Sequence, residues 1–90
     1  ISKLLADGEE VILPALNVPV VLQHVSGSPV AESTEHPRDE LASGEGSPVW
    51  SADPNGAMSA GDTREFCSSC PNGLRVIGGT ARLRIHTDLG

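Results

Sequence analysis

The feature that most constrains this chain is an alternating apolar stretch over residues 74–86 (LRVIGGTARLRIH), which a pair of glycines interrupts. Two alternating segments joined by a two-residue Gly-Gly link are a strong short-range signal for a β-hairpin. In this hairpin we expect Ile77 to pair with Thr80, which leaves one face apolar and the other basic. The apolar face consists of Leu74, Val76, Ala81, Leu83 and Ile85. The basic face consists of Arg75, Arg82 and Arg84.

The composition favours short strands and turns over long helices. The 90 residues include 10 glycines and 7 prolines, but only one tryptophan, one phenylalanine and no tyrosine. Because so few large side chains are present, we expect Trp50 to anchor the core. Turn signals near residues 54, 61, 72 and 78 delimit short strands at the spacing of antiparallel β proteins. We therefore predict an all-β fold, either a small antiparallel sandwich or a jelly-roll-like barrel.

The chain divides into an arm and one small domain. Residues 1–10 begin apolar and become polar, which predicts an extended, loosely attached N-terminal arm. Residues 11–90 then form a single small β domain. Within it, residues 26–48 are rich in Ser, Pro, Glu and Gly, and we interpret them as a long, flexible, acidic loop. Pro37 and Gly44 are placed to begin and end one or two helical turns inside that loop.

The segment before this loop is apolar on both faces of an extended chain. One face carries Val18, Val20 and Leu22, and the other carries Val21 and Val25. An apolar residue on each face needs cover on both sides, as in the middle of a sandwich or at an interface. We therefore predict Val18, Val20 and Leu22 as interface residues, together with Arg75, Arg82 and Arg84.

Charge limits the classes of partner. The formal net charge of −6 disfavours binding to nucleic acid, because phosphate backbones attract a basic surface. The apolar stretch of residues 11–25 is too short and too interrupted by polar residues and prolines to span a membrane. The three arginines predicted on one face are expected to be neutralised by acidic segments, and the alternative is that they dock on an acidic partner.

The two cysteines, Cys67 and Cys70, form the sharpest local motif. Their C-x-x-C spacing resembles half of a zinc ribbon, and two of His24, His36 and His86, or cysteines from a second copy, would be needed to complete such a site. Three states stay open: two free thiols, a local disulfide of the kind found outside the reducing cell, and a shared zinc site. We expect no metal ion and no cofactor, and we expect His24 and His86 to be hydrogen-bonded structural residues.

No catalytic motif is present, so we predict that the protein is not an enzyme. The thin core and the two-faced apolar segment favour a structural protein that self-associates or packs on a larger assembly. A viral capsid decoration or cement protein has this profile, which favours a virion or extracellular location. Two alternatives remain. One is a small binding module that uses residues 26–48 or the three arginines, and the other is a zinc-stabilised mini-domain built on Cys67 and Cys70.

Overall fold

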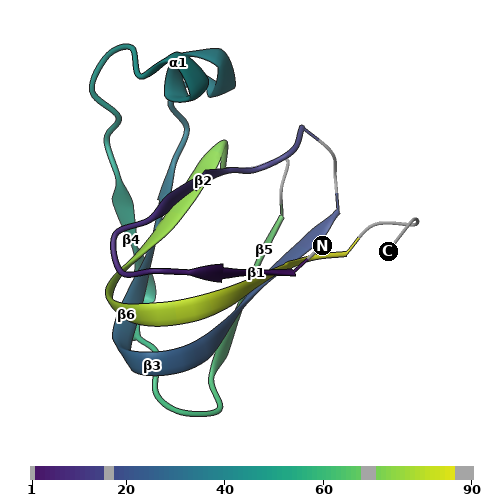
Figure 1. The fold of residues 1–90 in the computed structure, drawn as a ribbon, viewed down its shortest axis with the longest axis vertical. Helices are drawn as coiled ribbons and strands as arrows, with labels where there is room; N and C mark the ends of the chain where they lie inside the picture. The colour runs from purple at the N-terminus through teal and green to yellow at the C-terminus, as the bar shows by residue number, and fades with distance from the viewer. Residues whose placement is uncertain (1, 16–17, 68–70, 87–90) are drawn as a thin grey trace.

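The computed structural model describes residues 2–15, 18–67 and 71–86, and these residues form a six-stranded antiparallel sheet with one short helix (Figure 1). The elements are β1 (Ser2–Leu5), β2 (Glu10–Ile12), β3 (Pro19–Thr34), α1 (Arg38–Ser43), β4 (Ser51–Ala57), β5 (Thr63–Cys67) and β6 (Gly73–Ile85). The predicted all-β class is confirmed. The finer choice between a sandwich and a jelly-roll-like barrel stays a prediction.

The centre of the fold is a ribbon of two long antiparallel strands, β3 and β6. The register between them runs from Val20 opposite Ile85 to Thr34 opposite Gly73. Both strands curve strongly, so that the ribbon wraps around the core (Figure 1). Every other strand pairs with one half of one of these two strands.

The hairpin predicted at the Gly-Gly pair, residues 78–79, is wrong. Residues 73–85 continue as one strand, in which Ile77 pairs with Val30 and Thr80 pairs with Ser26. The physical reason is the length of β3, whose 16 residues provide backbone partners for both alternating segments. Hairpin-like pairing of consecutive strands occurs instead between β3 and β4.

The two segments of β6 nevertheless share one apolar face, as predicted. In a regular strand, Val76 and Ala81 would point to opposite faces, because side chains alternate and these two are an odd number of residues apart. The register with β3 shifts within residues 24–26 and 27–30, and Gly78 has a φ of 94°. Such irregularities bend a strand and interrupt its alternation. The bend therefore returns Leu74, Val76, Ala81, Leu83 and Ile85 to a common buried face.

Two pairs of short strands flank the ribbon. β1 and β2 pair with the two halves of β6, and we call them the β1–β2 flank. β5 and β4 pair with the two halves of β3, and we call them the β4–β5 flank. The core fills the space inside the bent ribbon and both flanks. It consists of Leu5, Leu13, Val20, Leu22, Ala31, Met58, Leu74, Val76, Ala81, Leu83 and Ile85.

Two predictions about chain organisation need correction. The expected arm of residues 1–10 is instead part of the sheet, because β1 and the first residue of β2 lie within it and Leu5 is fully buried. The expected loop of residues 26–48 begins as the second half of β3, since β6 pairs with it as far as Thr34. The short helix inside it is confirmed as α1, which follows Pro37 and ends at Gly44 in the left-handed conformation.

Trp50 is not the core anchor that its size predicted. Its ring is only half buried and lies over the guanidinium of Arg75, 4.4 Å from the ring centre. The core is filled instead by aliphatic side chains and Met58. Aliphatic residues suffice because the bent ribbon brings its own two halves together around a small interior.

Candidate functional site: a groove between β4 and β5

The predicted interface residues of β3 lie inside the fold. Val20 and Leu22 are fully buried in the core, and Val18 packs against it. The second apolar face of this segment is partly covered: Val21 is half buried, whereas Val25 is exposed at the first register shift. The cover that both faces require therefore comes largely from the rest of the same chain.

The three arginines lie on the face of β6 opposite the buried one, as predicted, but they do not form a continuous basic surface. The bend of β6 separates Arg75 from Arg82 and Arg84 along the strand. Arg75 pairs with Glu32 at 2.6 Å and approaches Glu10 at 3.8 Å, so its neutralisation by acidic segments of the same chain is confirmed. Arg82 donates a hydrogen bond to Ser2 Oγ at 3.2 Å, and Arg84 is exposed.

Two of the described histidines, His24 and His36, bond through their rings to backbone groups, whereas the role predicted for His86 stays a prediction. His24 Nε2 lies 2.8 Å from the carbonyl oxygen of Gly27, and His36 Nε2 lies 2.8 Å from that of Glu45. The structural role predicted for His24 is thereby confirmed. Within residues 2–15, 18–67 and 71–86, no three His, Cys, Asp or Glu side chains gather as metal ligands would.

The C-x-x-C motif falls outside the described residues, apart from the backbone of Cys67 at the end of β5. Its three open states therefore stay predictions: free thiols, a disulfide between Cys67 and Cys70, and a zinc site.

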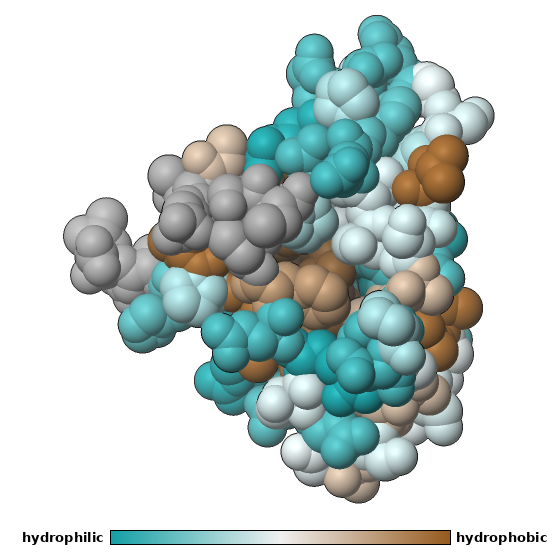
Figure 2. Space-filling model, turned by 180° about the vertical axis from the view of Figure 1, so that it is seen from behind, coloured by the Kyte–Doolittle hydropathy of each residue, from teal (hydrophilic) through white to brown (hydrophobic). Residues whose placement is uncertain are grey.

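A groove of about 710 Å³ opens between β4 and β5. Both strands pair with β3, but with opposite halves of it, so they diverge from the turn that joins them. Figure 2 shows the molecule from behind, with a hollow whose floor is apolar between hydrophilic margins. The groove is lined by Ser33, Thr34, Glu35, His36, Ser47, Val49, Ser51, Glu65, Phe66 and Pro71.

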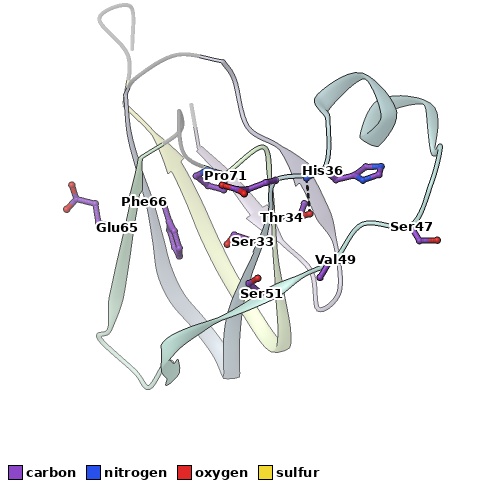
Figure 3. Close-up of a pocket in the computed structure, with 10 residues that line it drawn as sticks. Ser33, Thr34, His36, Ser47, Val49, Ser51, Glu65, Phe66 and Pro71 are labelled. Atoms are coloured by element: carbon purple, nitrogen blue, oxygen red, sulfur yellow. Dashed lines mark hydrogen bonds between the residues drawn. The ribbon is translucent and has the colours of Figure 1, made fainter.

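The interior of the groove combines an aromatic ring with small hydroxyl groups. Phe66 projects from β5 into the space between the strands, and Ser33 and Ser51 approach it from β3 and β4 (Figure 3). Glu65, the residue before Phe66, points away from that space, as alternation along a strand requires. Val49 is 80% exposed at the margin. The site is therefore apolar at its centre and acidic at its edge.

An ion pair joins the two strands near the turn that connects them. Arg64 Nε in β5 lies 3.1 Å from Asp53 Oδ2 in β4, and both side chains are largely buried, at 17% and 8% exposure. Asp53 Oδ1 also accepts a hydrogen bond from the backbone N–H of Asn55. These contacts hold β4 against β5 at the narrow end and leave the groove open at the other.

The two strands bordering the groove offer different edges. β4 contains Pro54, and its register with β3 is interrupted, both of which blunt an edge strand. β5 pairs regularly with β3 over all of its residues. The backbone N–H of His24 donates to the carbonyl of Asp62. The alternation of antiparallel pairing then turns the backbone groups of Thr63 and Glu65 away from β3.

The groove has no signature in the amino-acid sequence. The turn signal near residue 61 correctly separates β4 from β5, but the turn predicted near residue 54 is wrong, because Pro54 lies inside β4. No local signal shows that these two strands pair with opposite halves of one bent strand. Asp53 and Arg64 form no recognisable sequence motif, because they come together only when β4 and β5 lie beside each other.

The chain was also compared with protein-family models, with curated proteins and with solved structures, and no match was found. In the described residues, no helix has the length and apolar character needed to cross a membrane.

Proposed function

We propose that this protein is a non-enzymatic binding module that packs on a larger assembly by accepting an extended segment of another polypeptide. The segment would lie in the groove as an added strand on β5. The observation that carries the proposal is the regular edge of β5, which has no strand partner beyond β3 among the described residues and borders an apolar groove.

Strand addition fits both the backbone and the side chains of this site. The outward backbone groups of Thr63 and Glu65 supply main-chain hydrogen bonds to an extended peptide. Alternate side chains of that peptide would then point inward, toward Phe66 and Pro71. Main-chain bonds give such complexes affinity, and the pockets for alternate side chains give them specificity.

Val49 supports the same interpretation. It is the most exposed of the large hydrophobic residues in the described chain, and it stands at the margin of the groove. A strand added to β5 would extend the sheet toward β4 and cover this side chain. Burying an exposed valine contributes about 1.5–3 kcal/mol to association.

Three wider predictions from the sequence stay predictions. Self-association, decoration of a viral capsid and the absence of catalysis all agree with a module of this kind. The alternative binding module that used residues 26–48 as a flexible loop is less favoured, because β3 and α1 take up much of that segment.

A titration with defined peptides tests the proposal. The probe is a capped nine-residue peptide of alternating valine and threonine, added to the ¹⁵N-labelled protein and followed by NMR. We expect the amide signals of Thr63, Glu65 and Phe66 to shift. The control peptide carries N-methyl groups at every second residue, which removes the donors needed for strand pairing, and it should not bind. Equal binding of both peptides, or no binding of either, would overturn the proposal.

A pair of variants locates the binding surface. Val49→Asp places a charge at the margin of the groove and should weaken the affinity for the valine–threonine peptide about tenfold. Val25→Asp makes the same change at a residue that is 45% exposed and does not line the groove. We expect this control to bind like the wild type. Equal loss in both variants would contradict binding in the groove.

A further inference from the structure

The charged residues around the groove are predominantly acidic. The titratable residues along it are Glu35, His36 and Glu65, of which Glu65 directs its side chain to the outer face of β5, and no lysine or arginine lines the groove in the described part of the chain. The described contacts give neither glutamate an ion pair, whereas Glu10, Glu32 and Asp53 are each paired with an arginine. The margin of the groove therefore carries negative charge that its neighbours leave uncompensated.

The arginines nearest to Glu65 do not neutralise its negative charge. Arg64 is adjacent to Glu65 in β5, but its side chain points to the other face of the strand and pairs with Asp53. Arg84 shares the row of Glu65, with Val21 of β3 between them. Two strand spacings separate these charges by about 10 Å, where exposed charges are largely screened at physiological salt.

The same charges disfavour two of the registers in which a second copy of this chain could pair with β5. A two-fold axis perpendicular to the sheet would place β5 antiparallel to β5 of the other copy, with a residue opposite itself at the centre. Centred on Glu65, this pairing sets two carboxylates opposite each other, and centred on Arg64 it sets two guanidinium groups opposite each other. Like charges in directly opposite positions destabilise a strand pair. The net charge of −6 adds repulsion between copies.

We propose that the occupant of the groove is an extended segment in which basic residues alternate with apolar ones, with a lysine or arginine opposite Glu65. This inference rests on the proposed function and names the class of partner. The basic side chain lies on the outer face beside the Glu65 carboxylate. The apolar residues on either side of it lie on the inner face, one opposite Phe66 and one opposite Arg64, whose charge is paired with Asp53.

Three capped nine-residue peptides test this partner class. Each has valine at alternate positions, and the intervening residues are lysine, threonine or glutamate. We expect the lysine peptide to bind about two- to fivefold more tightly than the threonine peptide, and the glutamate peptide to bind most weakly. Raising the salt concentration from 0.05 to 0.5 M should reduce these differences, because the charges are exposed.

A charge-reversal variant assigns the preference to one residue. Glu65→Lys should reverse the order of the lysine and glutamate peptides and leave the threonine peptide little changed. Asp39→Lys makes the same change of net charge on the exposed surface of α1 and should keep the wild-type order. A reversal in both variants would overturn the role of Glu65 in favour of net charge.

The outcomes separate this inference from the proposed function. Failure of all three peptides to bind would overturn both. Binding of the three with equal affinity would overturn the basic partner and keep the groove as a strand-binding site. A stable dimer of the unmodified protein, with the amides of Thr63 and Glu65 protected from hydrogen exchange, would assign the groove to a second copy instead.

Discussion

The β1–β2 flank and the β4–β5 flank both cover the bent ribbon, but the first closes over the core and the second leaves a groove open. Each consists of two short strands that pair with the two halves of one bent strand. On the β1–β2 flank, Leu5 and Leu13 are fully buried and seal the core. On the β4–β5 flank, Ser51 and Phe66 border a groove, and an ion pair between Asp53 and Arg64 holds the narrow end.

The connecting turns, by contrast, are alike, since each bonds internally and also to the bent strand beside it. On the β1–β2 flank the turn bonds to the bend of β6: Gly8 donates its N–H to the carbonyl of Val76, and Asp7 accepts the N–H of Gly78. On the β4–β5 flank the turn bonds to β3 at both ends: Met58 donates its N–H to the carbonyl of Pro29, and the carbonyl of Asp62 accepts the N–H of His24. The two flanks therefore differ in the side chains between their strands and not in how their turns are held.

The largest expected loss of stability comes from truncating a core side chain of the β1–β2 flank. Leu5→Ala removes a fully buried side chain from the β1–β2 flank and should lower the free energy of unfolding by about 3 kcal/mol. Val49→Ala truncates an exposed residue on the other flank and should change it by less than about 0.5 kcal/mol. Urea denaturation of both variants measures the difference. Equal losses would mean that the two flanks contribute alike to the core.

The next largest loss of stability is expected at the bend of β6, on which both flanks depend. A Cβ on Gly79 would overlap the carbonyl oxygen of Ser26 and approach Pro29 Cδ to 2.7 Å. Gly79→Ala should therefore cost about 2 kcal/mol, since backbone atoms cannot rotate away from the new methyl group. Gly56→Ala is the control, because its Cβ meets open space and only its φ of 77° opposes the change. We expect about 1 kcal/mol there. A smaller loss at Gly79 than at Gly56 would contradict the close approach.

Breaking the ion pair tests what holds the β4–β5 flank together. Asp53→Asn keeps an oxygen acceptor for Asn55 but leaves the largely buried guanidinium of Arg64 without its counter-charge. We expect a loss of about 1–2 kcal/mol, with faster hydrogen exchange confined to β4 and β5. Uniformly faster exchange across β1 and β6 as well would show that the flank does not open on its own.

The smallest effect depends on pH and lies on the β1–β2 flank. The pKa of Glu9 is lowered, chiefly because its carboxylate accepts a hydrogen bond from the backbone N–H of Ala6, with a further contribution from Lys3. A lowered folded-state pKa adds stability above the ordinary value of 4.5, and that stability is lost as the pH falls through the folded value.

Glu9→Gln should therefore lower the Tm slightly at pH 7 and leave it unchanged in acid below the folded pKa. Thermal unfolding followed by circular dichroism across this range measures the change. Glu65→Gln removes an exposed carboxylate that the described contacts leave without an ion pair, and serves as the control. A Tm difference for Glu9→Gln that persists in strong acid would contradict the assigned cause.

Particular residues show how far the sequence could predict this fold. The alternation of residues 74–86 identified the buried face of β6 correctly, because period-two patterning reports directly which side chains face a core. The same stretch gave a wrong hairpin, because a Gly-Gly pair permits a bulge as readily as a turn. Helix α1 was predicted from Pro37 and Gly44, since its boundary signals are local.

The candidate site could not be predicted from the sequence, because it also depends on how distant strands pair. Phe66 lies in β5, Ser51 begins β4 and Val49 precedes it, and their proximity depends on which half of β3 each strand joins. Trp50 was misplaced because size alone favoured the core, while the position of Arg75 supplied an ion-paired cation for its ring.

By itself, the sequence determined the all-β class, the apolar faces of β3 and β6, and the short helix between β3 and β4. These depend on periodicity and on local conformational preference, which act over a few residues. Only the tertiary structure decided that β6 is one bent strand, that residues 2–5 belong to the sheet, and that one flank stays open. Those outcomes depend on the competition among distant strands for the same backbone partners.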